Sequence, residues 1–174
     1  MRTEHKVWIL TIFFAGLFAL GLYSAFKPES YPLKFIRGEV RPISENVIIG
    51  PYPEKKEWRR LGEDIGVDVI VSLMDPASVV EGGFVKTEKA MAHKYGMEFK
   101  NFPMDFLHLS DESNKVAAAA LARYILKSKG KKLFYVHCYL GRHRVEVFGD
   151  AYKALLKETN PAGVQEASTA TTTS

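Results

Sequence analysis

The single cysteine of the chain, Cys138, stands in a segment whose residue types suit nucleophilic attack on a phosphate ester. The apolar run Leu133–Val136 comes just before it and predicts a buried strand. Apolar residues at helical spacing follow Arg144, so we expect a helix to begin there. A loop between a strand and a helix turns successive backbone N–H groups into one concavity, and the helix dipole adds partial positive charge. Such a loop binds an oxyanion and favours the thiolate form of a cysteine.

Arg144 closes this predicted loop and brings a planar guanidinium. That group can donate to two phosphoryl oxygens at once, which the point charge of a lysine cannot do. A glycine within the loop lets the backbone approach closely where a side chain would block it. The alternative is that Cys138 is a buried structural cysteine, which packs like a small hydrophobic residue. We expect the substrate-binding positions to be Tyr139, Leu140, Gly141, Arg142 and His143.

The segment resembles the His-Cys-x5-Arg signature of the cysteine-dependent protein tyrosine and dual-specificity phosphatases. His137, Cys138, Gly141 and Arg144 stand at the signature positions. The ending Gly-x-His-Arg looks like that of atypical dual-specificity phosphatases which act on inositol phosphates or phosphoinositides. Together these positions are a specific match, because few chains of this composition would place all of them around one cysteine by chance.

The resemblance implies a general acid on a loop upstream of the cysteine. Asp105 follows a strand-like segment, 97–102, at the position that resembles the aspartate of the family. Asp111 is the second candidate, but it lies directly before a predicted helix that begins near Ser113 and would make a natural N-cap. Asp105 is therefore assigned the catalytic role, with Asp111 as the alternative. An ordinary loop aspartate in an Asx turn is the structural alternative for Asp105.

The implied mechanism has two steps and needs neither a cofactor nor a metal. Cys138 attacks phosphorus while Asp105 protonates the departing oxygen, and water activated by the same carboxylate then hydrolyses the phosphocysteine. Arg144 and the loop amides stabilise the phosphoryl oxygens. His137 is expected to support the loop, although a merely packed histidine explains it nearly as well. The five histidines show no metal-ligand spacing with cysteine or carboxylate, so a zinc site is not expected.

One position departs from the family. Ser or Thr usually follows the signature arginine, where the hydroxyl helps the cysteine leave in the second step, and this chain has Val145. The first step should survive and the second should be slow. A catalytically weak pseudophosphatase that binds phosphorylated ligands without turnover therefore remains an alternative.

Strand-like and helix-like segments alternate along the remainder of the chain. This alternation predicts an α/β fold with a largely parallel central sheet flanked by helices. We expect one phosphatase-like domain over residues 38–158, large enough to bury a core. The segment 43–52 resembles the opening strand and turn of the family. Further strands are predicted at 67–73 and 97–102, and helices at 54–65 and 86–95.

An uncharged apolar stretch at 7–26 precedes this domain and is long enough to cross about 30 Å of hydrocarbon as a helix. It exceeds the usual apolar core of a signal peptide, so a single-pass membrane anchor is expected, after a short tail at 1–6. Basic residues flank it on both sides, which leaves its orientation undecided. Residues 27–37 are expected to be a linker, and 159–174 a disordered tail rich in Thr, Ser and Ala.

The sequence supports a phosphomonoester hydrolase acting on phosphotyrosine or phosphoserine/threonine proteins, ranked first on the breadth of the family. Phosphoinositides and inositol phosphates are the alternative substrates, since Arg142 and His143 enlarge the positive field over the loop. A rhodanese-like sulfurtransferase is disfavoured because its loop is usually one residue shorter and needs no upstream acid. Nucleic acid is not an expected partner: the net charge of +4 is modest, and no basic face interleaved with aromatic residues stands out.

Overall fold

The computed structural model describes residues 2–25, 36–128 and 130–159. It divides into two compact units, the first ending at Arg37 and the second beginning at Gly38. The first unit contains helix α1 (Arg2–Ala25), and the second contains the sheet and every other element considered below. The linker predicted at 27–37 falls largely outside the described residues, as do positions 160–174 of the predicted tail.

Helix α1 differs from the expected membrane span in where it begins. It starts at Arg2 rather than at residue 7, so charged residues occupy its first turns. Across the described ranges, the chain has no helix that is both long enough and apolar enough to cross a membrane. The predicted transmembrane helix at 7–26 is therefore not supported.

A five-stranded sheet forms the centre of the second unit, in the order β1-β2-β5-β3-β4. Only β1 runs antiparallel to its neighbour, and the other neighbouring strands are parallel. This confirms the prediction of an α/β fold with a largely parallel sheet. The strands are β1 (Arg41–Ser44), β2 (Val47–Pro51), β3 (Val69–Ser72), β4 (Glu98–Asn101) and β5 (Phe134–Cys138).

The segment expected at 43–52 to be an opening strand and turn contains the end of β1, a tight turn and β2, and the two strands are antiparallel. Ser44 pairs directly with Val47, so the chain reverses within the apolar stretch. The two residues between them, Glu45 and Asn46, form the turn, and polar residues of this kind tolerate turn conformations. β2 thereby runs parallel to the strand that carries the cysteine.

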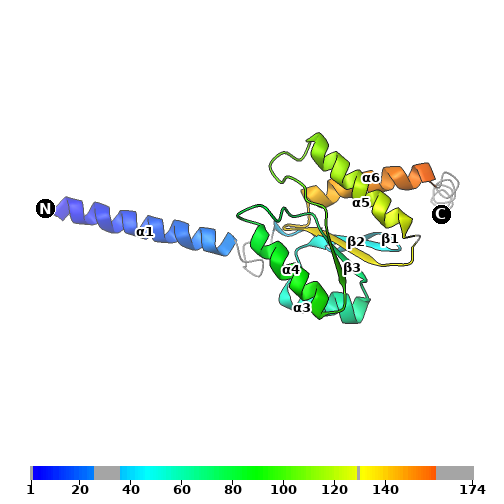
Figure 1. Cartoon of the computed structure of the whole chain (residues 1–174). Coiled ribbons are helices and arrows are strands. Elements are labelled where there is room, and N and C mark those ends of the chain that lie inside the picture. The colour runs from blue at the N-terminus through cyan, green and yellow to red at the C-terminus, as the bar shows by residue number, and fades with distance from the viewer. Residues whose placement is uncertain (1, 26–35, 129, 160–174) are drawn as a thin grey trace, which may run out of the picture. The chain divides into compact units, whose positions relative to one another are not determined.

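Helices cover both faces of the sheet (Figure 1). On one face lie α5 (Glu112–Lys127) and α6 (His143–Thr159). The other face is covered by α3 (Lys55–Arg59), the π-helix η1 (Arg60–Ile65) that continues it, and α4 (Gly82–Lys94). The helix predicted at 54–65 is thus found as α3 with η1, and the one predicted at 86–95 begins earlier, at Gly82.

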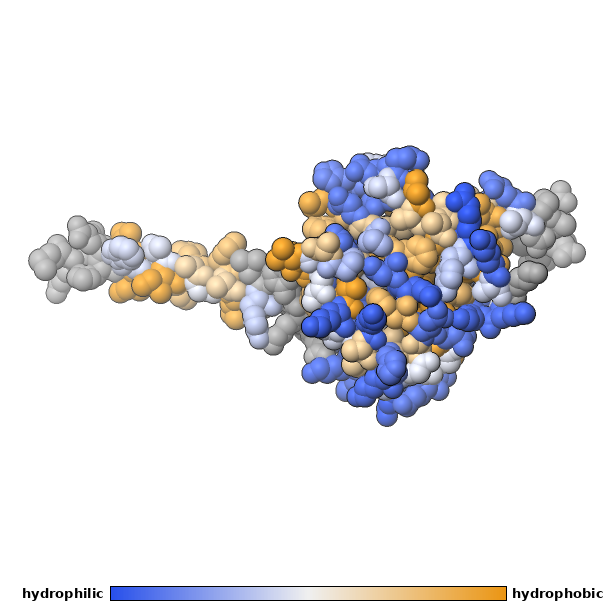
Figure 2. Space-filling view, viewed as in Figure 1, coloured by the Kyte–Doolittle hydropathy of each residue, from blue (hydrophilic) through white to orange (hydrophobic). Residues whose placement is uncertain are grey.

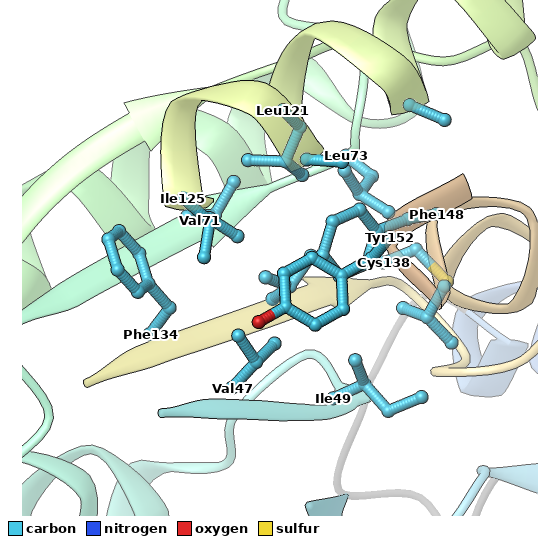
Figure 3. Packing of buried hydrophobic residues seen from close by; sticks show 14 of the residues in the cluster. Val47, Ile49, Val71, Leu73, Leu121, Ile125, Phe134, Cys138, Phe148 and Tyr152 are labelled. Atoms are coloured by element: carbon cyan, nitrogen blue, oxygen red, sulfur yellow. The ribbon is translucent and has the colours of Figure 1, made fainter. Parts of the chain in front are cut away.

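Alternation along β5 divides its side chains between two cores. Phe134, Val136 and Cys138 point into the core beneath α5 and α6, which Figure 3 shows from close by. Tyr135 and His137 point to the opposite face, toward α3 and α4. Because successive side chains of a strand alternate between faces, the residue before the cysteine belongs to the other layer. Polar side chains cover much of the visible surface of this unit (Figure 2).

Candidate active site

The loop that follows Cys138 lies between the end of β5 and the start of α6 at His143. Backbone hydrogen bonds fix it from the neighbouring segments: the N–H of Gly38 donates to the Leu140 carbonyl at 2.7 Å, and the N–H of Tyr52 donates to the Tyr139 carbonyl at 3.2 Å. This is the strand–loop–helix arrangement that the sequence predicts around the cysteine. The N-terminus of α6 therefore lies at the end of the loop, where its dipole favours an anion.

Gly141 takes a backbone conformation that explains why a glycine is required here. Its φ is +69°, in the left-handed region, and a Cβ atom would overlap the backbone of Gly50 and Pro51. Any other L-residue would meet both the torsional penalty and the clash. The loop consequently packs tightly against the end of β2.

Arg144 is buried within the second unit and is held at several atoms. Its Nη1 and Nη2 donate to the two carboxylate oxygens of Glu81 at 2.9 and 2.5 Å. Nη1 also donates to the backbone carbonyls of Leu73 at 3.2 Å and Met104 at 3.3 Å. Bidentate contacts of this kind fix the plane of a guanidinium. Arg144 is therefore held in one position before any ligand arrives.

The electrostatics of Arg144 connect it to the cysteine. Burial lowers its pKa, but the hydrogen bond with Glu81 and the attraction to Cys138 outweigh burial, so the pKa lies above its ordinary value. The guanidinium thus stays charged beside the sulfur. The aromatic ring of Phe106 lies 5.9 Å from the Arg144 Cζ atom and adds a cation–π contact.

The remaining predicted loop positions differ in exposure. Tyr139 and Leu140 are partly exposed, Gly141 is buried, and Arg142 and His143 are exposed. Cys138 itself is 3% exposed, at the base of the loop. Arg142 and His143 can therefore contact an anionic ligand that arrives from solvent. The sulfur of Cys138 lies deeper.

Asp105 is on the loop between β4 and α5, and this loop borders Arg144. The neighbours of Asp105 on both sides, Met104 and Phe106, contact the arginine. Its own carboxylate, however, bonds within the loop: it accepts from the N–H groups of Leu107 and His108 at 2.6 and 3.2 Å. The bond with the His108 side chain, followed by that from the Leu107 amide, lowers the pKa of Asp105. The Asx turn predicted as the structural alternative is thus present.

Asn114 holds this loop from the first turn of α5, a role that no pattern in the sequence indicates. It is almost fully buried, at 1% exposure. Its Oδ1 accepts from the Asp105 N–H at 2.7 Å, and its Nδ2 donates to the carbonyls of Asp105 and His108 at 2.9 and 3.1 Å. Asp111 stands at the N-cap position of α5, although its side chain makes no capping hydrogen bond. Its role as the alternative acid stays a prediction.

His137 lies on the sheet face opposite to Cys138, in a fully buried contact with Glu88 of α4. Its Nε2 atom is 3.1 Å from Glu88 Oε2, close enough for an ion pair but without hydrogen-bond alignment. The ring of Tyr135 stacks on the imidazole, and the ring of Tyr52 meets it edge to face. Burial, with a further contribution from the charge of Glu88, raises the pKa of Tyr52. His137 thus joins β5 to α4 beneath the loop.

Sequence reasoning missed both carboxylates, Glu81 and Glu88. Each is distant from its partner along the chain, and neither belongs to a local motif. No group of three or more His, Cys, Asp or Glu side chains that could hold a metal ion occurs among the described residues.

Comparison with known proteins rests on the fold. No protein-family model matches the sequence, and no curated protein is significantly similar to it. A crystal structure of a "putative phosphatase (DUF442)" from Shewanella putrefaciens CN-32 is similar with a TM-score of 0.52 and 22% sequence identity, covering 70% of this chain and 73% of that one. The crystal structure of a mutant form of Tk-PTP is similar with a TM-score of 0.50 and 19% sequence identity, and the match covers 74% of this chain and 77% of Tk-PTP. The chain therefore has an α/β fold of the protein tyrosine phosphatase type.

Proposed function

We propose that the protein is a cysteine-dependent phosphatase that hydrolyses phosphomonoesters, with phosphotyrosine and phosphoserine/threonine proteins as its substrates. The observation that carries this proposal is the position of Arg144. It follows Cys138 at the end of an anion-binding loop, and its charged guanidinium lies beside the sulfur. A structural cysteine needs no such neighbour.

The reaction proceeds in two displacements. The Cys138 sulfur attacks phosphorus, the bond from phosphorus to the ester oxygen breaks, and that oxygen takes a proton from an acid on the Asp105 loop. A water molecule then attacks the phosphocysteine and gives a proton back to the group on the Asp105 loop that acted as the acid, the phosphorus–sulfur bond breaks, and the sulfur leaves as thiolate. Arg144 and the N–H groups at the start of α6 stabilise the charge on the phosphoryl oxygens in both steps.

One feature beside the site supports an aromatic phosphate ester as ligand. Arg142 and His143 are exposed and can attract any phosphate ester, so they serve phosphoproteins and inositol phosphates alike. Phe106 is 46% exposed and lies next to Arg144, so an aromatic surface stands beside the phosphate position. Assay of phosphotyrosine, phosphoserine and inositol phosphate substrates side by side tests the substrate class, and higher kcat/KM on inositol phosphates would reverse the ranking.

The decisive test replaces the nucleophile in the full chain. Cys138→Ser should abolish hydrolysis of para-nitrophenyl phosphate and retain binding of a phosphotyrosine peptide, because the loop and Arg144 are unchanged. Arg144→Ala should lose both. Lys127→Ala, at the exposed end of α5, serves as the control and should match the wild type. Equal turnover in Cys138→Ser would refute the proposal.

A second candidate, a phosphate-ester binder without turnover, is favoured by one observation. A valine, Val145, directly follows Arg144 and is fully buried, and its side chain has no hydroxyl to assist the departing sulfur. Rapid mixing with para-nitrophenyl phosphate separates the candidates. A stoichiometric burst followed by a slow phase indicates a phosphatase limited by the second step, whereas binding with neither burst nor turnover indicates the binder.

A further inference from the structure

The residues just before strand β1 contact the loop that follows Cys138. The N–H of Gly38 donates to the carbonyl of Leu140 at 2.7 Å. A Cβ atom on Gly38 would overlap the carbonyl group of Gly141. Only a residue without a side chain can therefore come this close to the loop, so the hydrogen bond requires the glycine.

The end of β2 holds the same loop from a second segment. The N–H of Tyr52 donates to the carbonyl of Tyr139 at 3.2 Å. Gly141 lies so close to the backbone at the end of β2 that a Cβ atom on it would overlap that strand. Two consecutive carbonyls, those of Tyr139 and Leu140, are thus held by donors from outside the loop.

The direction of these carbonyls determines where the loop N–H groups point. In a trans peptide unit the C=O and N–H bonds point in opposite directions, and the described ranges contain no cis peptide bond. Because the Tyr139 and Leu140 carbonyls are turned toward outside donors, the N–H groups of the residues that follow each of them are turned the other way. These N–H groups belong to the loop between Cys138 and Arg144, where phosphoryl oxygens need donors.

The segment that carries Gly38 is itself fixed to the fold. Arg41, at the start of β1, pairs with Ile49 of β2. Its Nη2 atom also donates to both carboxylate oxygens of Glu146, in the first turn of α6, at 2.7 and 2.8 Å. An exposed ion pair adds little stability by itself. Together with the strand pairing, however, it fixes the chain close to Gly38.

We propose that Gly38 is a positioning residue for phosphate binding: its N–H holds the peptide between Leu140 and Gly141 so that the Gly141 N–H faces the ligand. This rests on the proposed phosphatase function, because the ligand is the phosphate group of the substrate. Gly38 acts only through the loop. Since coupling between two linked equilibria is reciprocal, phosphate bound in the loop should in turn strengthen the Gly38 hydrogen bond.

The first test measures binding of inorganic phosphate to the full chain by isothermal titration calorimetry. Gly38→Ala cannot keep the hydrogen bond without displacing Gly141, so the dissociation constant for phosphate should rise about tenfold. Gly62→Ala is the matched control, because its Cβ atom would also crowd a backbone carbonyl, that of Tyr95, which does not belong to the loop. Its phosphate affinity should equal that of the wild type. An equal loss of affinity in both variants, or none in Gly38→Ala, would overturn the proposal.

A second measurement uses the wild type and stands even where Gly38→Ala does not fold. Saturating phosphate should slow hydrogen exchange of the Gly38 amide, followed by NMR, by about fivefold. The Gly66 amide, which donates to the Leu61 carbonyl at the end of η1, is the internal control and should not change. Unchanged exchange at Gly38 would contradict the proposed coupling.

The outcomes separate the role of Gly38 from the proposed function. Phosphate binding that Gly38→Ala weakens, in a wild type without turnover, would support the role of Gly38 and refute hydrolysis. Turnover in the wild type, with a phosphate affinity that Gly38→Ala does not change, would refute the role of Gly38 alone. A wild type that binds no phosphate would refute both.

Discussion

Arg144 depends on a partner that lies far from it in the sequence. Glu81, just before α4, is 4% exposed and binds both terminal nitrogens of the guanidinium. It also accepts from the N–H of Asp75, which closes the loop that follows β3. A buried ion pair of this kind contributes little net stability but is costly to break, since the remaining charge is left buried without compensation.

Replacing Glu81 tests this dependence. Glu81→Gln keeps the shape but removes the charge, so we expect a destabilisation of about 3 kcal/mol. Arg144 should also lose its fixed orientation, with a loss in kcat/KM of about 10- to 100-fold. Urea denaturation and steady-state kinetics measure the two effects. Glu63→Gln, an exposed change in η1, is the control, and equal behaviour of the two variants would show that Arg144 is positioned by other contacts.

Val145 gives a prediction on the second step of the reaction. Val145→Ser should raise the steady-state rate about tenfold and reduce the burst, because a hydroxyl can assist departure of the sulfur from the phosphocysteine. Its side chain is fully buried, so the same change should cost about 1–3 kcal/mol of stability. Val145→Ala removes volume without adding a hydroxyl and is the matched control. A rise of equal size in both variants would exclude the hydroxyl as the cause.

Asn114 joins the start of helix α5 to the Asp105 loop by three hydrogen bonds. Asn114→Ala leaves the backbone N–H of Asp105 and two carbonyl groups without this partner, so stability should fall by about 1–3 kcal/mol. The position of the loop should loosen as well, with kcat reduced and para-nitrophenyl phosphate affected less than an alkyl phosphate. Ser113→Ala, exposed on the same turn, should change neither quantity. Unaltered kcat in Asn114→Ala would mean that the loop is held in other ways.

The elements were predictable where their local patterns agree with their packing. The strand that ends at Cys138 and the helix that follows it are both marked by apolar spacing, so the sequence places the loop and Arg144 correctly. The start of helix α4 was predicted too late. Gly82 and Gly83 have low helix propensity, so the sequence does not mark them as helical, yet the folded helix includes both. Glu81, Glu88 and Asn114 could not be assigned from sequence, since their partners are brought together only by the folded sheet.

The whole second unit depends on two cores, one on each face of the sheet. Leu121 is fully buried beneath α5, and Leu121→Ala should destabilise the protein by about 2–5 kcal/mol through lost burial and the remaining cavity. Val116→Ala, on the exposed face of the same helix, should cost about 0.5 kcal/mol or less. Urea denaturation of the full chain measures both. Similar midpoints would contradict the assignment of Leu121 to the core.

The sheet order also determines when the protein can fold during synthesis. β5 is the last of the five described strands along the chain, yet it lies between β2 and β3 and pairs with both. Until the ribosome has released residues 134–138, the hairpin β1–β2 and the pair β3–β4 have no strand to join them. Such long-range pairing is slow because the intervening chain must close first. The thiol of Cys138 thus arrives on the segment that completes the sheet, so the nascent chain gains its core and its nucleophile in the same event.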